Sequence, residues 1–319
     1  MAKVYIARPI PEVGVNMLKE KYEVEINPES KVLSKEEFKN AVRGTDALLS
    51  LLSDKIDGEV LDAAGSQLKI VANYAVGYDN IDIEAAKQRN VLVTNTPDVL
   101  TEAVAEHAIA LIFSAAKSIV EADKYTRSGQ YTQWEPKGFL GPQLTSKTLA
   151  VIGLGRIGSM VAEIAHKGLN MNILYYDVKR NEEFESKVDA KYGELDQVLK
   201  ESDVVSIHVP LLPATKHLLN KEKLSLMKRT AILINTSRGP VVDEKALIDA
   251  LKSKQIWAAG LDVFENEPVL SPGLVNLPNV TITPHTASAT IEARDAMSKM
   301  CAENIIAVLS GQTPPNPVK

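Results

Sequence analysis

The chain has 319 residues, a net charge of −5 and a single cysteine. This length suggests two domains, and the mild acidity provides no basic surface for nucleic acid or for an anionic membrane. The lone Cys301 cannot form a disulfide within the chain, which favours a reducing compartment such as the cytoplasm. We expect no secretory leader. The longest apolar stretch, 103–116, contains Glu106 and His107 and is too short to cross a bilayer.

The first hundred residues alternate short apolar runs with segments of helical period, a pattern typical of βαβ units and parallel sheets. The five expected strands lie at 3–7, 22–26, 46–51, 68–71 and 91–94. They predict a small doubly wound domain of the flavodoxin-like kind. A long amphipathic helix at 100–127 follows, and then a polar stretch with glycine and proline at 128–146.

A second alternation starts after this polar stretch. Its expected strands lie at 148–152, 172–177, 203–208, 230–235, 257–262 and 280–283. Six strands are the full set of a dinucleotide-binding Rossmann fold, so we expect the closing helix at 290–310 to pack back on the first domain. The sequence therefore predicts an α/β protein with two doubly wound parallel sheets. Residues 1–99 and 286–319 would form one domain, and an inserted dinucleotide-binding domain would span 100–285.

The strongest local signal is the run GLGRIG from Gly153 to Gly158. It follows an apolar strand and begins an amphipathic helix, which is the context that a dinucleotide site requires. In such a turn Gly153 permits the tight bend, Gly155 lets the backbone approach a pyrophosphate, and Gly158 lets helix and strand pack closely. The phosphates would lie on the N–H groups at the helix N-terminus, beside Arg156 and Ile157.

Asp177 stands at the end of the next expected strand. A carboxylate at this position accepts hydrogen bonds from a ribose 2′-hydroxyl and repels a 2′-phosphate. This favours NAD(H). Lys179 and Arg180 follow closely and could accommodate a phosphate, so NADP(H) stays open as the alternative.

Titratable residues follow three of the later strands, at Arg238, at Asp262 with Glu267, and at His285. In open parallel sheets ligands bind outside the carboxyl ends of the strands, so these residues should lie on the cofactor edge. Reduction of a 2-keto acid needs a cation for the carboxylate and a proton donor for the developing alkoxide. Arginine and a carboxylate-backed histidine supply both.

Several other enzyme classes are disfavoured. The five histidines show no zinc-ligand spacing; they are His107, His166, His208, His217 and His285. The sequence has no Gly-x-Ser-x-Gly elbow and no P-loop. A metal-dependent alcohol dehydrogenase, a serine hydrolase and a P-loop NTPase therefore fit poorly.

Seven ordered segments resemble the D-isomer-specific 2-hydroxyacid dehydrogenase family over nearly the whole chain. They are residues 72–82, 95–103, 151–158, 202–210, 234–240, 260–268 and 283–285. The resemblance implies that Arg238 binds the substrate carboxylate and carbonyl, that His285 is the acid/base and that Glu267 is its partner. It also implies that Asp262 holds the nicotinamide carboxamide.

The resemblance adds further contacts. The backbone at Val76 and Gly77, with Ser53, would bind the substrate carboxylate. The remaining expected cofactor contacts are Thr101, Val209, Pro210, Thr215 and Thr236. Family members have a catalytic domain made from both chain ends around an inserted dinucleotide domain. They are usually homodimers that pair through the dinucleotide domains and an arm, here 128–143, which carries Trp134.

Within the family, the chain is most similar to glyoxylate/hydroxypyruvate reductases, especially the short archaeal type. Formate dehydrogenases have glutamine where this chain has Glu267. Phosphoglycerate dehydrogenases usually carry an Arg-Ser pair that meets the substrate phosphate. This chain has residues 51–55 at that place, and we expect Lys55 to be the only cation there. A small, unphosphorylated keto acid therefore fits best. D-3-phosphoglycerate dehydrogenase, D-lactate dehydrogenase and a non-catalytic NAD(H)-sensing corepressor remain as alternatives.

Overall fold

The computed structural model describes residues 1–318, which form two α/β units. Unit 1 contains residues 1–100 and the chain from residue 289 onward, and unit 2 contains residues 101–288. The boundaries expected from the sequence lie one residue and three residues before these positions. The chain thus leaves unit 1 and returns to it, with unit 2 inserted between.

Unit 1 contains a sheet of five parallel strands. These are β1 (Lys3–Ile6), β2 (Glu23–Ile26), β3 (Ala47–Ser50), β4 (Ile70–Asn73) and β5 (Leu92–Thr94). Their order is β2-β1-β3-β4-β5, the doubly wound order of flavodoxin-like folds. The central strands β3 and β4 are buried along their whole length, because helices cover both faces of the sheet.

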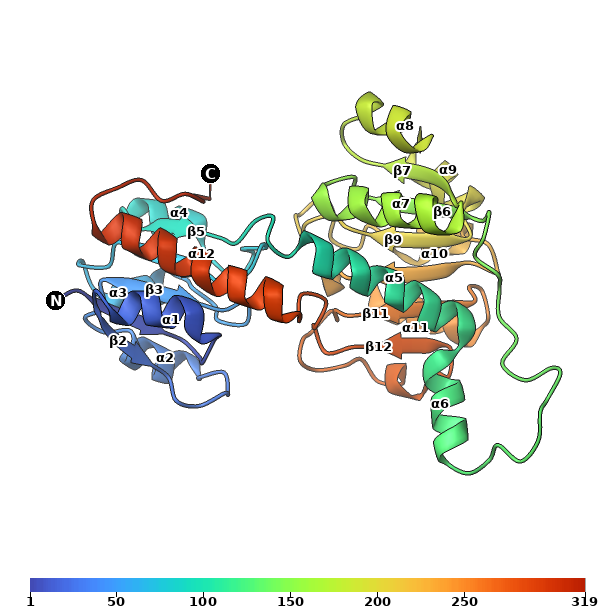
Figure 1. Cartoon of the computed structure of the whole chain (residues 1–319), viewed down its shortest axis with the longest axis horizontal. Helices are drawn as coiled ribbons and strands as arrows, with labels where there is room; N and C mark the ends of the chain where they lie inside the picture. Colours follow the sequence, from blue (N-terminus) through green and yellow to red (C-terminus); the bar gives the residue numbers. More distant parts are fainter. Residues whose placement is uncertain (319) are drawn as a thin grey trace. The chain divides into compact units, whose positions relative to one another are not determined.

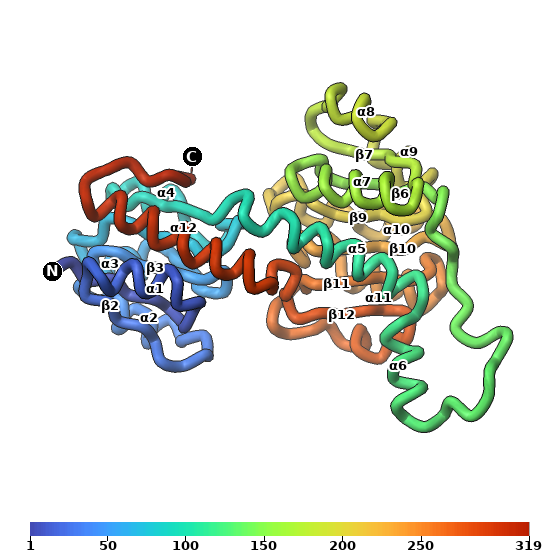
Figure 2. The backbone as a smooth tube through the Cα atoms, in the orientation of Figure 1, coloured from blue at the N-terminus to red at the C-terminus, as the bar shows by residue number. Residues whose placement is uncertain are grey.

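The helices of unit 1 form two layers (Figure 1). They are α1 (Glu12–Lys19), α2 (Lys35–Ala41), α3 (Gly58–Ala64), α4 (Ile83–Gln88) and α12 (Ile291–Leu309). Helices α2, α3 and α4 share one apolar core with the sheet, and α12 packs on α1, β3 and β4. The C-terminal tail then returns to the sheet, where the Val318 N–H donates to the Val93 carbonyl at 2.8 Å (Figure 2).

Unit 2 contains a sheet of seven parallel strands, one more than expected. They are β6 (Thr148–Ile152), β7 (Asn172–Tyr176), β8 (Lys191–Tyr192), β9 (Val204–Ile207), β10 (Ile232–Asn235), β11 (Ala258–Leu261) and β12 (Val280–Ile282). The order β12-β11-β10-β9-β6-β7-β8 is the Rossmann order with β12 added at the edge. The expected count of six was wrong because β8 has two exposed residues and no apolar run.

The unit 2 sheet lies between two helical layers (Figure 1). Helices α5 (Thr101–Lys117), α7 (Arg156–Leu169) and α8 (Glu182–Val188) contribute to the core on one face. Helices α9 (Leu195–Glu201), α10 (Lys221–Leu226) and α11 (Glu244–Lys252) contribute to the core on the other. Both alternations of the sequence therefore fold as two-faced parallel sheets, as the apolar runs predicted.

The single long helix expected at 100–127 was wrong. The chain forms α5 and a separate α6 (Ile119–Arg127), bent by 63° where Ser118 takes a left-handed conformation with φ of 51°. Helix α6 buries none of its residues, and the chain after it extends from the sheet as an arm (Figure 2). In residues 1–318 no single helix is long and apolar enough to cross a bilayer, and only the bent pair α5–α6 has the length and composition.

Candidate active site

The carboxyl ends of all the unit 2 strands meet at one edge of the sheet, because the strands are parallel. Most of the predicted residues of unit 2 follow these strand ends. The glycine turn follows β6, Asp177 follows β7, Val209 and Pro210 follow β9, Thr236 and Arg238 follow β10, Asp262 follows β11 and His285 follows β12. Ligands of open parallel sheets bind at this edge.

The glycine turn has the shape that a dinucleotide requires. Gly153 has φ of 95°, and a Cβ there would lie 2.8 Å from the Val209 side chain. A Cβ on Gly158 would lie 2.1 Å from the Gly153 carbonyl oxygen. A Cβ on Gly155, in contrast, would meet no atom within 4 Å. The turn is closed on its inner side and open at Gly155, where room for a pyrophosphate is needed.

The N-terminus of α7 faces the same open space. Helix α7 begins at Arg156 after Gly155, and no side chain caps it. Its first N–H groups and the positive end of the helix dipole therefore suit an anion. Ile157 packs against the core of this face, which fixes the first turn of the helix to the sheet.

Asp177 joins the end of β7 to the glycine turn. Its Oδ2 accepts from the Leu154 N–H at 2.7 Å. Arg180, the more obvious phosphate ligand nearby, is paired with Glu185 through two hydrogen bonds of 2.8 and 2.7 Å. This guanidinium and the Tyr175 hydroxyl lower the pKa of Glu185 to about 2, so Glu185 is charged and the pair persists at neutral pH.

Two predicted cofactor threonines differ in their surroundings. The buried Thr236 hydroxyl, at the end of β10, has no hydrogen-bond partner. An orphaned polar atom on this edge is consistent with a bound polar ligand. The Thr215 hydroxyl instead donates to the Pro210 carbonyl at 2.6 Å and accepts from the Leu212 N–H at 2.8 Å. Thr215 therefore closes the turn after β9, and Thr101 begins α5.

His285 and Glu267 form a direct pair. His285 Nδ1 lies 2.8 Å from Glu267 Oε2, and Glu267 Oε1 accepts from the Phe264 N–H at 2.9 Å. The carboxylate thus orients the imidazole by one oxygen and is itself held by the other. Both residues line a cavity of about 260 Å³ on unit 2.

Arg238 lies beside the loop that carries Glu267. It follows β10 and precedes the short 3-10 helix Gly239–Val241. Its carbonyl accepts from the Asn235 amide at 3.0 Å, and a Cβ on Gly239 would lie 1.9 Å from the Phe264 backbone. Strands β10 and β12 are separated by β11 alone, which puts their ends about 10 Å apart. The fold therefore places Arg238, Glu267 and His285 after three neighbouring strands, on one edge of the sheet.

His208 is a second histidine on the same edge. Burial lowers the pKa of His208 to about 4, and its Nε2 lies 2.8 Å from the Ser206 hydroxyl. His208 is therefore neutral at physiological pH, which makes it a poor proton donor.

Asp262 is fully buried. Its Oδ1 accepts from the Thr283 hydroxyl at 2.6 Å and from the Thr286 N–H at 2.8 Å, and its Oδ2 accepts from the Ala287 N–H at 2.8 Å. Burial alone would raise the pKa of Asp262, but hydrogen bonds from His107, Thr283 and these amides outweigh it and lower the pKa. Sequence reasoning did not identify His107 or Thr283 as site residues.

The predicted substrate residues of unit 1 follow β3 and β4. Ser53 lies after β3, and Val76 and Gly77 lie after β4. Two asparagine side chains hold the loop after β4. The Asn95 amide donates to the Val76 carbonyl at 2.7 Å, and the Asn73 amide donates to the Gly77 carbonyl at 2.8 Å.

The expectation that Lys55 is the only cation near the first loop was wrong. Arg8 donates a hydrogen bond to the Ser53 hydroxyl, and its guanidinium lies 3.8 Å from Asp54 Oδ1. Burial raises the pKa of Asp54, against the opposing effects of a backbone hydrogen bond and Arg8. The signal for Arg8 was its position directly after the first strand, at the same sheet edge.

Comparisons with known proteins agree with this geometry. Residues 109–287 match the NAD binding domain of D-isomer specific 2-hydroxyacid dehydrogenases. A glyoxylate reductase of Pyrococcus furiosus is 51% identical over 317 residues, which cover 98% of this chain and 94% of the relative. The chain belongs to the D-isomer specific 2-hydroxyacid dehydrogenase family. It is an NAD(P)-dependent oxidoreductase, as predicted.

Solved structures resemble this dehydrogenase along its whole length. A protein of Thermus thermophilus has a TM-score of 0.93 and 42% identity, covering 99% of this chain and 100% of its own. The NADPH-dependent glyoxylate/hydroxypyruvate reductase of Sinorhizobium meliloti, in complex with NADP and malonate, has a TM-score of 0.86 and 32% identity, covering 99% and 96%. The predicted α/β architecture with a Rossmann domain is confirmed.

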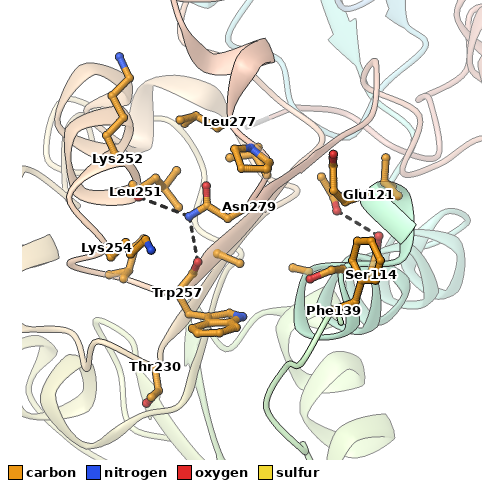
Figure 3. Close-up of a pocket in the computed structure, with 18 of the residues that line it drawn as sticks. Ser114, Glu121, Phe139, Thr230, Leu251, Lys252, Lys254, Trp257, Leu277 and Asn279 are labelled. Carbon is orange, nitrogen blue, oxygen red and sulfur yellow. Dashed lines mark hydrogen bonds between the residues drawn. The ribbon is translucent and has the colours of Figure 1, made fainter. Parts of the chain in front are cut away.

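A second cavity of the dehydrogenase, about 700 Å³ in volume, lies at the opposite edge of the unit 2 sheet. Thr230, Trp257 and Asn279 line it at or just before the starts of β10, β11 and β12, and Phe139 enters from the arm (Figure 3). The Asn279 amide donates to the Trp257 carbonyl at 2.9 Å. This cavity is separate from the cofactor edge.

The glycine turn of the dehydrogenase gives a testable prediction. We expect Gly155→Ala to weaken NADH binding by about tenfold, because the added methyl group would project into the space for the pyrophosphate. The melting temperature should stay unchanged, since no atom lies within 4 Å of the new Cβ. Titration of NADH fluorescence and thermal melts measure both.

Gly168→Ala is the matched control, because its Cβ would also meet no atom within 4 Å. It should bind NADH like the wild type. Equal affinity in both variants would contradict the placement of the pyrophosphate at Gly155.

Proposed function

We propose that this protein reduces glyoxylate and hydroxypyruvate to glycolate and D-glycerate with a nicotinamide cofactor. The observation that carries the proposal is the 2.8 Å pair of His285 and Glu267 on the sheet edge that holds the glycine turn. The 51% identity to a glyoxylate reductase supports this choice among keto acids.

The reaction adds one hydride and one proton across a carbonyl group. The bound cofactor, as NADH or NADPH, supplies the hydride to the carbonyl carbon. His285, held through Nδ1 by Glu267, donates the proton from Nε2 to the carbonyl oxygen as that oxygen gains negative charge. The Arg238 guanidinium binds the substrate carboxylate by its planar fork and orients the carbonyl. The product is a 2-hydroxy acid, and the reverse steps oxidise it.

Unit 2 acts in this proposal as the dinucleotide-binding domain and unit 1 as the substrate domain. Ser53, Val76 and Gly77 are its predicted contacts to the substrate carboxylate. Asp177 accepts a hydrogen bond from a hydroxyl of the adenine ribose. Arg180 is paired with Glu185 and is therefore not available to bind a 2′-phosphate. NADH is therefore the preferred cofactor.

We further propose that the protein is a cytoplasmic homodimer that pairs through unit 2. Large apolar side chains are exposed at one end of this unit, on α6, on the arm and at the start of β11. They are Ile119, Val120, Tyr131, Trp134, Phe139, Leu140 and Trp257. Several of them border the 700 Å³ cavity, and a second copy would cover such a patch. The lone, buried Cys301 suits a reducing compartment.

The proton-donor assignment predicts a large loss of rate in His285→Ala. We expect kcat with glyoxylate and NADH to fall by at least about a hundredfold, the usual contribution of a general acid. The dissociation constant of NADH should change little. Steady-state kinetics and fluorescence titration separate the two effects.

His217→Ala is the control for this variant, because His217 also pairs with a carboxylate, Glu265, at 2.7 Å. It should keep near-normal turnover. Near-normal turnover in His285→Ala would instead disprove the assignment of the proton donor.

Asp177→Ser is expected to move cofactor preference toward NADPH. Removal of the carboxylate ends its repulsion of a 2′-phosphate, and we expect the ratio of kcat/KM for NADPH to that for NADH to rise by about tenfold or more. Measurement of both cofactors with one substrate gives this ratio directly. An unchanged ratio would mean that Asp177 does not face the ribose.

The dimer proposal predicts that Trp257→Glu produces monomers, because it places a charge in the apolar patch. Light scattering coupled to gel filtration measures the mass. Val13→Glu is the control, since Val13 and Trp257 are both 39% exposed and Val13 lies on unit 1. A monomeric wild type, or a dimeric Trp257→Glu protein, would refute pairing through this patch.

A further inference from the structure

His285 has a backbone conformation that must be held in place. Its φ is 53°, in the left-handed region, which costs a residue with a side chain about 1–2 kcal/mol. Its own N–H donates to the Asp262 carbonyl at 2.9 Å and to the Thr283 carbonyl at 3.0 Å. The Glu267 carboxylate orients the ring but does not hold this backbone.

One buried carboxylate binds the chain on both sides of His285. Asp262 accepts from the Thr283 side chain before it and from the Thr286 and Ala287 amides after it. All three bonds are 2.8 Å or shorter. The turn that presents the imidazole is therefore fastened to the end of β11.

Both oxygens of the buried Asp262 carboxylate accept hydrogen bonds from this turn. Each carboxylate oxygen has two lone pairs and can accept a further bond. The holding role therefore does not depend on the nicotinamide carboxamide contact expected from the family resemblance.

His107 on α5 completes the cluster. Its Nε2 lies 3.0 Å from the Thr283 hydroxyl and 3.5 Å from Asp262 Oδ1. A hydroxyl has one hydrogen, and Thr283 donates it to the Asp262 carboxylate, which can only accept. Thr283 must therefore accept from His107, so Nε2 of His107 carries a proton.

We propose that His107 and Thr283, through Asp262, are positioning residues for His285. His107 directs the Thr283 hydroxyl at the carboxylate, and the carboxylate holds the left-handed turn so that the His285 ring can meet Glu267 and the substrate. This inference rests on the proposed function only for the role of His285 as acid. The hydrogen-bonded cluster itself links two segments 176 residues apart.

Thr283→Val tests the proposal, because valine keeps the shape and loses the hydroxyl. We expect kcat with glyoxylate to fall by about tenfold or more as the acid moves from its productive position, with KM and the NADH dissociation constant within about twofold. Thr283→Ser restores the hydroxyl and should restore most of kcat. His107→Leu should resemble Thr283→Val, and His107→Gln, which retains an N–H donor, should recover part of the loss.

Thr281→Val is the matched control. Thr281 lies on the same strand and also bonds to a side chain of α5, with its Oγ1 3.0 Å from the Ser114 hydroxyl. It should lower the melting temperature about as much as Thr283→Val while keeping wild-type kcat. Equal loss of kcat in both threonine variants would overturn the proposal, because it would indicate a general effect of α5–β12 packing.

A double-mutant cycle with His285→Ala gives the decisive comparison. If Thr283 acts through His285, Thr283→Val should cause no further loss of kcat in the His285→Ala background. A further tenfold loss there would overturn the proposal. If the wild-type protein does not reduce glyoxylate, the proposed function itself is refuted.

Nitrogen NMR of protein labelled in its histidines tests the cluster without activity. Thr283→Val should shift the ring signals of both His107 and His285, assigned by His107→Leu and His285→Ala, and Thr281→Val should leave His285 unchanged. An unmoved His285 signal in Thr283→Val would refute the positioning role whatever the substrate.

Discussion

The parallel direction of every strand in unit 2 is the constraint on which the site depends. Parallel strands bring all their carboxyl ends to one edge, so loops far apart in sequence meet there. The glycine turn after β6 and His285 after β12 are separated by more than a hundred residues but share this edge. In the proposed mechanism the glycine turn, Arg238 and His285 each come from a different strand end.

The two carboxylates near His285, Glu267 and Asp262, have different proposed roles because their surroundings differ. Glu267 is 30% exposed in its side chain and contacts the ring at Nδ1. Asp262 is wholly buried and contacts the backbone and Thr283. A partly exposed carboxylate such as Glu267 can adjust its position and solvation when the charge of the imidazole changes. A buried carboxylate whose two oxygens are both hydrogen-bonded, such as Asp262, keeps a fixed geometry.

Much of this arrangement could be predicted from the sequence, because it depends on local patterns. Apolar runs located both sheets, and the glycine spacing with Asp177 predicted the dinucleotide-binding domain that the family match supports. The two-residue β8 was missed because its residues are exposed. The break at Ser118 was missed because no glycine or proline marks it, although Ser118 takes a left-handed conformation there. Neither feature has a compositional signal.

Contacts between distant side chains were the least accessible to sequence reasoning. Arg8 meets Ser53 through neighbouring strands β1 and β3, and His107 meets Thr283 because α5 packs across β12. His107 stood in the sequence as a polar residue in an apolar helix, where a single imidazole needs one buried partner. Its partner becomes identifiable only when the order of the strands is known, because that order decides which strand end lies under the helix.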